Sequence, residues 1–459
     1  MKELRFPQGF IWGTSTAGHQ IEGNNIHSDW WEFEEKGKIY DGTKSAKAVD
    51  YWNRFEEDHR LMKELSYPAF RLGIEWAKLE PEKGRYDLNA LNHYRKIFDS
   101  LRDKGIKICL TMYHWVLPLW VAKAGGWENP EAVNWWTNYC EKAVKEFAQY
   151  PDIWVTLNEP LVPAAAGYLG GEFPPEKKSF KSFIGVVAAL LRAHLNCYEV
   201  IHANTSSAPD GTAVKAGVAQ AYQWIEPWGS KGLKGLYERF MTNLFRLGSF
   251  EAWDKAICSG RLKFPLRRSV EIPRLKGSYD YSGINYYFRF SLRFDAGKRG
   301  EGLIDRDSIP EGIEKTQMGW QIYPKGFYLV IKDNWERFKK PIYILENGIA
   351  DDKDLQRPKY LLEHLAQVHR AIKDGCDLRG YFQWAFTDNF EWREGFAKKF
   401  GLIECDYKDP NLTRKPRKSA YMYSEIIREN GITEEIVKKY SPEAEEGVFG
   451  KSPALFQRL

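Results

Sequence analysis

The feature that most constrains the fold is a regular alternation of short apolar runs with longer helical segments along the whole chain. Short runs rich in β-branched and aromatic residues are typical of buried strands. The runs cover residues 9–16, 69–76, 107–115, 153–160, 215–222, 281–288, 341–348 and 378–386. Strands that alternate with helices form parallel sheets, and eight such units close into a barrel.

The segments between the runs have the spacing of amphipathic helices. In residues 88–105 the apolar positions are Leu91, Tyr94, Ile97, Phe98 and Leu101. Residues 358–375 have the same construction. An open doubly wound sheet would need a glycine-rich phosphate turn after its first strand, and GTSTAG at residues 13–18 is not GxGxxG. The sequence therefore predicts an α/β fold, a single (β/α)8 TIM barrel with elaborated βα loops.

The chain reads as one domain, although its 459 residues would also suit two or three. It has no proline-rich or Ser/Gly-rich linker, no low-complexity segment and no repeat of 20 to 50 residues. We therefore expect one catalytic barrel domain over residues 1–459.

Net charge and cysteine spacing limit the classes of binding partner and the cellular compartment that we expect. The net charge of +5 is a small difference between 67 basic and 62 acidic residues that are interspersed, so nucleic acid is not an expected partner. The six cysteines have irregular spacing without a CxxC pair, which favours free thiols in a reducing compartment. The start has no signal pattern, and no stretch approaches the roughly 18 apolar residues of a membrane helix. We expect a cytoplasmic protein without a membrane partner.

Polar residues recur at the ends of the predicted strands, where barrels of this type carry their chemistry. They are Gln20, Arg71, His114, Asn158, Glu159, Tyr287, Glu346 and Trp384. Glu346 alone could simply begin a solvated loop, since Asn347-Gly348 is a turn signal. Glu159 changes that interpretation, because the fourth and seventh strands lie nearly opposite each other in an eight-stranded ring. Two opposed carboxylates suit glycosidic cleavage, and the 18 tryptophans offer flat faces that stack on sugar rings.

Six segments, in this order, resemble glycoside hydrolase family 1, the β-glucosidase-like retaining enzymes. They are GFIWGTSTAGHQIEG, TLNEP, INYY, MGWQIYP, ILENG and YFQWAFTDNFEW, and they extend over nearly the whole chain. The resemblance implies a retaining exo-β-glycosidase acting on terminal, unphosphorylated β-linked sugars. A β-glucosidase is the first expectation, with β-galactosidase or β-fucosidase activity as additions. Small oligosaccharides or aryl or alkyl β-glycosides are the expected substrates, and no metal ion or cofactor is expected.

The resemblance also implies a division of labour between the two carboxylates. Glu159 matches the general acid/base, and Glu346 matches the nucleophile that forms a covalent glycosyl-enzyme. An ionised Glu346 nearby is expected to raise the pKa of Glu159 by like-charge repulsion, so that Glu159 keeps its proton near neutral pH.

Further residues match positions around these two carboxylates in the family. Arg71 and Tyr287 match the positions that contact the nucleophile, although an arginine at a strand end could equally form a structural ion pair. Asn285 is expected to support the pocket, and Trp320 is an aglycone-side candidate. The matched sugar-binding positions are Gln20, His114, Asn158, Glu391 and Trp392, with Trp384 stacking under the ring. His114 could instead be a core histidine.

Some positions depart from the family pattern. Val116 replaces a common aspartate, and Ala385 and Phe386 stand where serine and leucine are frequent, which affects loop packing and specificity. Relatives that accept 6-phosphorylated sugars carry a serine in place of Glu391, so we expect this chain to reject them. The tail over about 434–459 has no family signature and is expected to dock on the barrel or to pack against another subunit of a homo-oligomer.

Other functions are compatible with parts of this pattern. A transglycosylase would use the same two carboxylates with a sugar acceptor in place of water. A non-catalytic carbohydrate-binding barrel usually loses one carboxylate, and this chain keeps both Glu159 and Glu346. A metal hydrolase has little support, because His364 and His369 are spaced i,i+5 without an HExxH motif.

Overall fold

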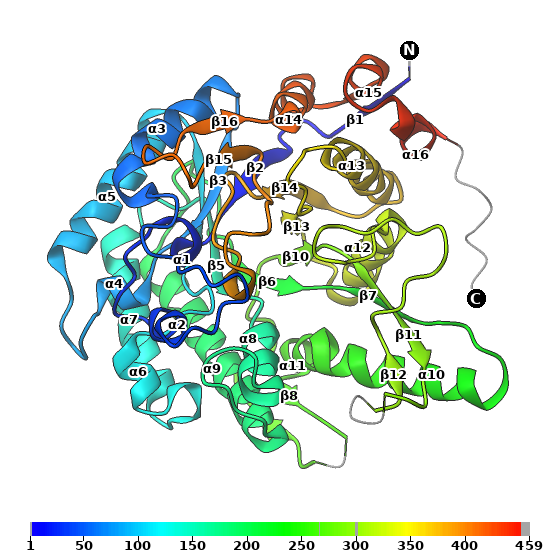
Figure 1. Cartoon of the computed structure of the whole chain (residues 1–459). Helices are drawn as coiled ribbons and strands as arrows, with labels where there is room; N and C mark the ends of the chain where they lie inside the picture. Colours follow the sequence, from blue (N-terminus) through cyan, green and yellow to red (C-terminus); the bar gives the residue numbers. More distant parts are fainter. Residues whose placement is uncertain (1, 266, 299–301, 451–459) are drawn as a thin grey trace.

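Eight parallel strands close into a barrel in the computed structural model, which describes residues 2–265, 267–298 and 302–450. The strands follow one another around the ring in chain order, and the last pairs with the first. They are β2 (Ile11–Ser15), β3 (Ala69–Gly73), β4 (Lys107–Thr111), β5 (Ile153–Asn158), β6 (Ala216–Ala221), β10 (Ser282–Tyr286), β13 (Ile342–Asn347) and β14 (Leu378–Trp384). Each lies within one of the predicted runs, so the predicted (β/α)8 barrel is confirmed (Figure 1).

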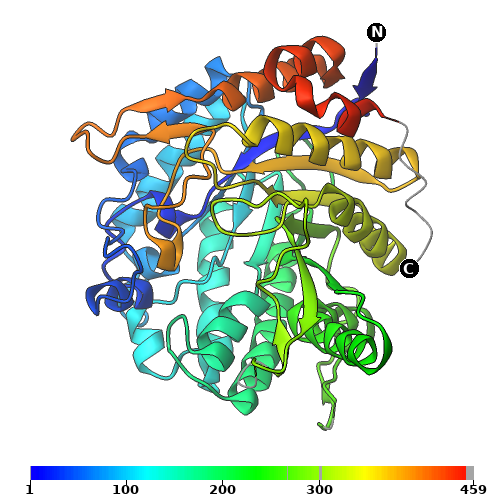
Figure 2. The same ribbon diagram turned by 45° about the vertical axis from the view of Figure 1, so that its right-hand side comes forward.

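Helices surround the barrel (Figures 1 and 2). They include α3 (Tyr51–Glu64), α5 (Leu88–Asp103), α7 (Ala132–Phe147), α9 (Phe180–Asn204), α12 (Pro324–Phe338), α13 (Arg357–Lys373) and α14 (Lys418–Glu429). Helix α5 begins where the Asp87 side chain accepts hydrogen bonds from the backbone N–H groups of Asn89 and Ala90, a typical N-cap. Its predicted apolar positions are buried. The spacing in the sequence therefore located both α5 and α13 correctly.

Helix α9 contradicts the expectation that no stretch of the chain has the apolar length of a membrane helix. It is long and apolar enough, by length and composition, to cross a membrane, whereas the sequence analysis expected no such segment. In the fold it packs against α7, and 67% of its most apolar window is buried within the protein. Its apolar character is therefore explained by core packing, since a helix that is apolar around most of its circumference needs neighbours on several sides.

Elaborated loops follow β5, β6 and β10. After β5 the chain forms α8 (Leu161–Ala165) and the π-helical turn η2 (Ala166–Gly170). After β6 it forms β7 (Trp224–Pro227), α10 (Gly232–Arg246), the π-helical turn η3 (Leu247–Glu251) and α11 (Ala252–Ser259). After β10, β11 (Arg289–Phe294) joins β7 and β12 (Ile304–Asp305) in a small separate sheet, beside α10 in Figure 1.

The two ends of the described chain lie together. Strand β1 (Glu3–Arg5) pairs antiparallel with β17 (Gly431–Thr433). Beyond β17, α15 (Glu434–Tyr440) contacts α14, and α16 (Glu445–Phe449) contacts α13. These helices form the described part of the tail considered above, and residues 451–459 of that tail lie outside the described residues.

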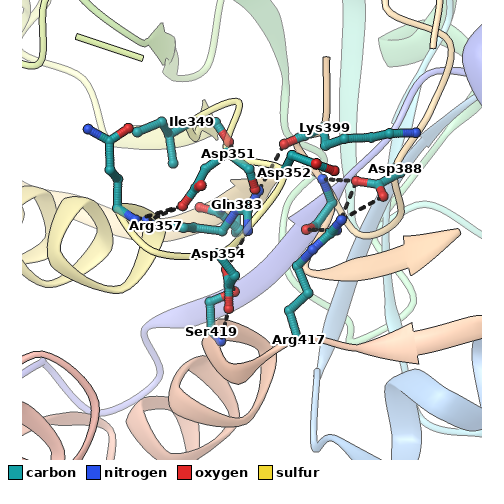
Figure 3. Close-up of polar contacts among 12 residues, drawn as sticks. Ile349, Asp351, Asp352, Asp354, Arg357, Gln383, Asp388, Lys399, Arg417 and Ser419 are labelled. Carbon is teal, nitrogen blue, oxygen red and sulfur yellow. Dashed lines mark hydrogen bonds and ion pairs between the residues drawn. The ribbon is translucent and has the colours of Figure 1, made fainter. Parts of the chain in front are cut away.

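A buried network of ion pairs ties the loops after β13 and β14 to α14 (Figure 3). We call it the anchoring network; it comprises Asp351, Asp354, Arg357, Asp388, Arg417 and Ser419. Arg417 donates from Nη1 and Nη2 to the two oxygens of Asp388, both at 2.9 Å. Arg357 donates to the carbonyl oxygens of Asp351 at 2.7 Å and Lys399 at 2.8 Å and pairs with Asp354. Asp354 also accepts from the Ser419 hydroxyl at 2.6 Å, so both loops are fixed to one helix.

Candidate active site

Glu346, at the end of β13, is held by both of its carboxylate oxygens. Arg71, from β3, donates from Nη1 to Oε1 at 2.5 Å, and the Tyr287 hydroxyl donates to Oε2 at 2.5 Å. The Glu346 residue is only 3% exposed, and Arg71 is fully buried. At Gly348, an added Cβ would lie 1.8 Å from the carbonyl oxygen of Trp384, so the turn after the carboxylate accepts only glycine. The two donors fix the carboxylate in one orientation.

Two amide side chains, those of Asn158 and Asn285, connect Arg71 and Glu346 to Glu159. Asn158 accepts from Arg71 Nη2 at 2.6 Å and from Asn285 Nδ2 at 3.0 Å. The same Asn285 nitrogen donates to Glu159 Oε1 at 2.8 Å. We call these six residues, Arg71, Asn158, Glu159, Asn285, Tyr287 and Glu346, the central network. The barrel therefore brings together all the catalytic and supporting residues predicted from the sequence.

The barrel strands lose their regular register where they carry this network. Pairing shifts between Val155 and Asn158 in β5 and between Ile284 and Asn285 in β10. A third shift lies between Ile344 and Asn347 in β13, the segment that contains Glu346. Such bulges re-aim side chains and are common beside active sites. The irregular register explains how neighbouring strands can direct polar side chains toward one another.

Glu159 lies directly after β5 in a strained backbone conformation and has a perturbed carboxyl group. Its φ of 45° is in the left-handed region, which is unfavourable for a residue with a Cβ and is common at functional sites. The residue is 7% exposed. The pKa of Glu159 is raised to about 8, first by burial and next by the charge of Glu346, while the Asn285 hydrogen bond opposes both. The charge of Glu346 was the cause predicted from the sequence, whereas burial is the larger cause.

Two buried polar atoms of the predicted sugar-binding residues are left without hydrogen-bond partners. The His114 Nε2 atom accepts from Asn158 Nδ2 at 2.9 Å, and burial together with Arg71 holds the pKa of His114 well below its usual range. The imidazole is therefore neutral with its proton on Nδ1. Among residues 2–265, 267–298 and 302–450, neither that Nδ1 nor Gln20 Oε1 has a partner. A free donor and a free acceptor suit sugar hydroxyls, which can both donate and accept.

Glu391 lies beside Gln20, with a protonation state that the sequence analysis did not anticipate. Gln20 Nε2 donates to Asn389 Oδ1 at 3.0 Å, to the Phe390 carbonyl at 2.8 Å and, more weakly, to Glu391 Oε2 at 3.3 Å. Burial of the carboxyl group, aided by the charge of Glu346, raises the pKa of Glu391 to about 8. The sequence predicts Glu391 as a sugar-binding residue, and its raised pKa favours the protonated form at neutral pH. A protonated Glu391 can donate as well as accept.

Aromatic side chains surround these polar groups. The His114 ring lies 6.1 Å from Trp384 and 5.8 Å from Trp392, between ring centroids. Trp392 also contacts Trp115, at 4.6 Å, and Trp30, at 4.7 Å. Trp115 further donates from Nε1 to the Asn158 carbonyl at 3.1 Å. Trp115 was not predicted from the sequence, although its place directly after His114 at a strand end was an available signal.

Trp320 packs against the apolar cluster that contains Trp384 and Phe400. Its indole stacks on Phe288 with ring centroids 4.5 Å apart, and it lies 5.7 Å from the ring of Tyr287. It is half-buried. Trp320 is therefore a neighbour of the group that orients Glu346, as an aglycone-side residue would be.

Known proteins resemble this chain over nearly its full length. The family described as "Glycosyl hydrolase family 1" matches residues 2–432. A β-glycosidase structure from Pyrococcus horikoshii has a TM-score of 0.87 and 36% identity and covers 99% of this chain and 100% of its own. A 1,4-β-D-glucan glucohydrolase of Thermotoga neapolitana is 33% identical over 94% of this chain and its own full length. A β-galactosidase of Saccharolobus solfataricus is 30% identical over 94% of this chain and 96% of its own. The chain belongs to glycosyl hydrolase family 1 and is a glycoside hydrolase that acts on O-glycosyl bonds.

Proposed function

We propose that this chain is a retaining exo-β-glucosidase in which Glu346 is the nucleophile and Glu159 is the general acid/base. The observation that carries the assignment is the contrast between the two carboxyl groups. Glu346 is oriented by a guanidinium and a phenol hydroxyl, whereas burial raises the pKa of Glu159 to about 8. One group is thus prepared to attack and the other to give a proton. A Thermotoga maritima β-glucosidase structure in complex with glucoimidazole, 31% identical with a TM-score of 0.84, supports the choice of glucose.

In the first step the glycosidic bond is exchanged for an ester. A Glu346 carboxylate oxygen attacks the anomeric carbon while the bond to the leaving oxygen breaks. Glu159 transfers its proton to that oxygen, and an alcohol departs. The enzyme then carries a glycosyl ester on Glu346 and an ionised Glu159.

In the second step water replaces the enzyme at the anomeric carbon. Esterification removes the negative charge of Glu346, and with it the second cause of the raised pKa of Glu159. Glu159 takes a proton from the water, the hydroxyl oxygen bonds to the anomeric carbon, and the Glu346 carboxylate leaves. Two inversions give net retention, and Glu159 is protonated again.

A panel of nitrophenyl glycosides with product stereochemistry tests this function. We expect nitrophenyl β-glucoside to have the highest kcat/KM, and the first sugar product, followed by proton NMR, to be β-glucose. An α-glucose first product would contradict the retaining assignment, and a higher kcat/KM on β-galactoside or β-fucoside would change the preferred sugar. Product analysis at high substrate concentration separates hydrolysis from transglycosylation, because a transglycosylase would accumulate oligosaccharides instead of free glucose.

Several expectations stay predictions from the sequence. They are the single domain over residues 1–459, the cytoplasmic location, the homo-oligomer, and the absence of nucleic-acid and membrane partners. Gel filtration with light scattering would decide the oligomeric state.

A further inference from the structure

A second group of buried polar side chains lies beside the predicted sugar-binding residues and takes no part in the proposed chemistry. We call it the His19 cluster; it comprises His19, Asn25, Glu34, Ser45 and Glu75, each no more than 3% exposed. His19 belongs to the one-turn helix α1 (Gly18–Ile21), and Glu34 belongs to α2 (Asp29–Glu35). The other three lie in the loops that follow β2 and β3. The cluster therefore joins two short helices at the carboxyl end of the barrel.

Hydrogen bonds hold the His19 imidazole at both of its nitrogen atoms. Nε2 lies 2.8 Å from Glu34 Oε1, and Nδ1 lies 3.2 Å from Asn25 Nδ2. The His19 backbone N–H donates to Glu75 Oε1 at 2.9 Å. Glu34 is fixed in turn, because its Oε2 accepts from the backbone N–H and from the hydroxyl of Ser45, each at 2.7 Å. The imidazole ring is therefore held in one orientation.

The His19 ring stacks on Trp392, which begins η5 (Trp392–Glu394) and is a predicted sugar-binding residue. The two rings are nearly parallel, at 8°, and their centroids are 5.8 Å apart. This separation is within the roughly 6 Å over which a cation is attracted to an indole ring. A cationic His19 should therefore hold the Trp392 indole more firmly than a neutral one.

The surroundings of His19 favour its cationic form. Burial lowers the pKa of His19, but the hydrogen bond and charge of Glu34 outweigh burial, and the net change is upward. The acidic groups that act on the ring are Glu34 and Asp29, from α2, and Glu75, which precedes α4 (Trp76–Leu79). The other ring neighbours are Trp30, Phe390 and Trp392. Burial raises the pKa of Asp29 and of Glu75 to about 7, so the protonation of His19 has to be followed directly.

We propose that His19 and Glu34 are a positioning pair, which sets the affinity of the sugar site by holding the Trp392 indole in place. The pair acts through Trp392 and lies outside the central network. An indole that is already held in its binding position loses little freedom when the sugar arrives, which increases affinity. The inference rests on the proposed function and adds residues that control its sugar binding.

The first test follows the His19 imidazole of the unchanged protein by carbon-13 NMR, with its signal assigned through its loss in His19→Gln. Methyl 1-thio-β-glucoside should raise the pKa of His19, because the coupling between proton binding and sugar binding is reciprocal. His202 is the matched control, since it lies 2.8 Å from Asp280 in a half-exposed pair on α9, and its signal should not respond. The same His19 pKa with and without the sugar would overturn the proposal.

The second test removes the charge of Glu34 and keeps its size. In Glu34→Gln, calorimetry should show about tenfold weaker binding of methyl 1-thio-β-glucoside, and kcat on nitrophenyl β-glucoside should change by less than about twofold. The pKa of His19 should fall in this variant. Glu35→Gln is the matched control, since Glu35 is the next residue of α2, is exposed and pairs with Lys44 at 2.7 Å. Equal affinities in the two variants, or a loss confined to kcat, would contradict the proposal.

A milder variant covers the case in which Glu34→Gln does not fold. Ser45→Ala removes one donor to Glu34 and leaves the backbone N–H donor in place, so we expect a folded protein with about threefold weaker sugar binding. An unchanged affinity in Ser45→Ala, together with a His19 pKa that does not respond to the sugar, would overturn the positioning pair alone. An unchanged protein that fails to hydrolyse nitrophenyl β-glucoside would overturn the proposed function as well.

Discussion

The central network and the anchoring network are both buried and both rich in carboxyl groups. They differ in how many hydrogen-bond donors and positive charges lie next to each carboxyl group. In the anchoring network, Asp388 receives two hydrogen bonds from Arg417 and one from the Gly401 N–H at 3.0 Å. Asp351 Oδ2 accepts hydrogen bonds from the backbone N–H groups of Gln356 and Arg357, at 2.7 and 2.9 Å. In the central network, Glu159 has the Asn285 amide as its hydrogen-bond donor, at 2.8 Å.

The difference shows that one fold can use buried carboxyl groups in two ways, to hold loops in place and to transfer protons. Carboxylates paired with guanidinium groups and N–H donors hold their charge and fix loops in place. Around Glu346, Arg71 donates to Glu346, whereas burial together with the charge of Glu346 raises the pKa of Glu159 and of Glu391 to about 8. Because few donors stabilise the ionised form of these carboxyl groups, they keep protons that can be transferred near neutral pH. We therefore expect changes in the central network to affect rate and changes in the anchoring network to affect stability.

The largest effect should follow Glu346→Gly. Hydrolysis should fall by at least about 10⁴-fold, because no other group attacks the anomeric carbon from that side. Azide should restore turnover of an activated β-glucoside and give the α-glycosyl azide. A β-azide product, or activity close to that of the unchanged protein, would refute the nucleophile assignment.

Glu159→Ala should show a loss that depends on the leaving group. Alkyl glucoside hydrolysis should fall by about 10²- to 10⁴-fold, since a poor leaving group needs the proton. A dinitrophenyl glucoside should still form the glycosyl-enzyme, and azide should then give a β-glycosyl azide. Rates measured on the two substrates decide the matter: equal losses would be inconsistent with a general acid.

Asp388→Asn tests the other side of the comparison. It leaves the Arg417 guanidinium buried with a weakened partner, so the free energy of unfolding should fall by about 3–5 kcal/mol in a denaturant titration. Asp352→Asn is the matched control, because Asp352 is exposed in the same region, and it should change stability by less than about 0.5 kcal/mol. Similar stabilities for the two variants would show that the anchoring network does not stabilise the fold.

A phosphate group on the sugar should be disfavoured in the sugar site, because the Glu391 carboxyl group supplies no positive charge to compensate it, whether protonated or ionised. Nitrophenyl β-glucoside should exceed its 6-phosphate by at least about a hundredfold in kcat/KM. The neighbouring lysines are already engaged, since Lys398 donates to the Gln317 carbonyl at 2.9 Å and Lys399 lies 3.8 Å from the Tyr407 ring centroid. Glu391→Ser should narrow the ratio. A preference of the unchanged enzyme for the phosphate would contradict this role of Glu391.

The smallest effect concerns the pKa of Glu159. The unchanged enzyme should lose kcat/KM as the pH rises through about 8, because the general acid is then deprotonated. In Glu346→Gln the pKa of Glu159, followed by carbon-13 NMR, should fall and still stay above the ordinary value for a glutamate, since burial remains. The same measurement on Asp388→Asn should give the unchanged value. A complete return to the ordinary pKa in Glu346→Gln would mean that the charge of Glu346, and not burial, is the main cause.

The sequence predicted the barrel and the positions of the central network because both depend on local signals. Strand runs, helix spacing and strand ends are readable residue by residue, and the position of a strand end in a barrel implies that its side chains converge. Glu159, Glu346, Arg71 and Tyr287 are all located by this rule, whereas Asn285 was predicted from the family resemblance.

The remaining features depend on tertiary packing. The anchoring network joins two loops to a distant helix, and no local pattern indicates that Asp388 pairs with Arg417. The protonation of Glu391, and the larger cause at Glu159, depend on how much water the fold removes.

The seam between β14 and β2 has a consequence for how the molecule is made. Ile11 pairs with Gly380 and Ser15 with Trp384, so the first barrel strand to leave the ribosome must wait for the last. The entropy cost of closing so long a loop grows only with the logarithm of its length, but contacts between distant residues slow folding. During synthesis β2 therefore keeps an unpaired edge until nearly the whole chain exists, and the pairing of β1 with β17 then fastens the two chain ends beside the finished seam.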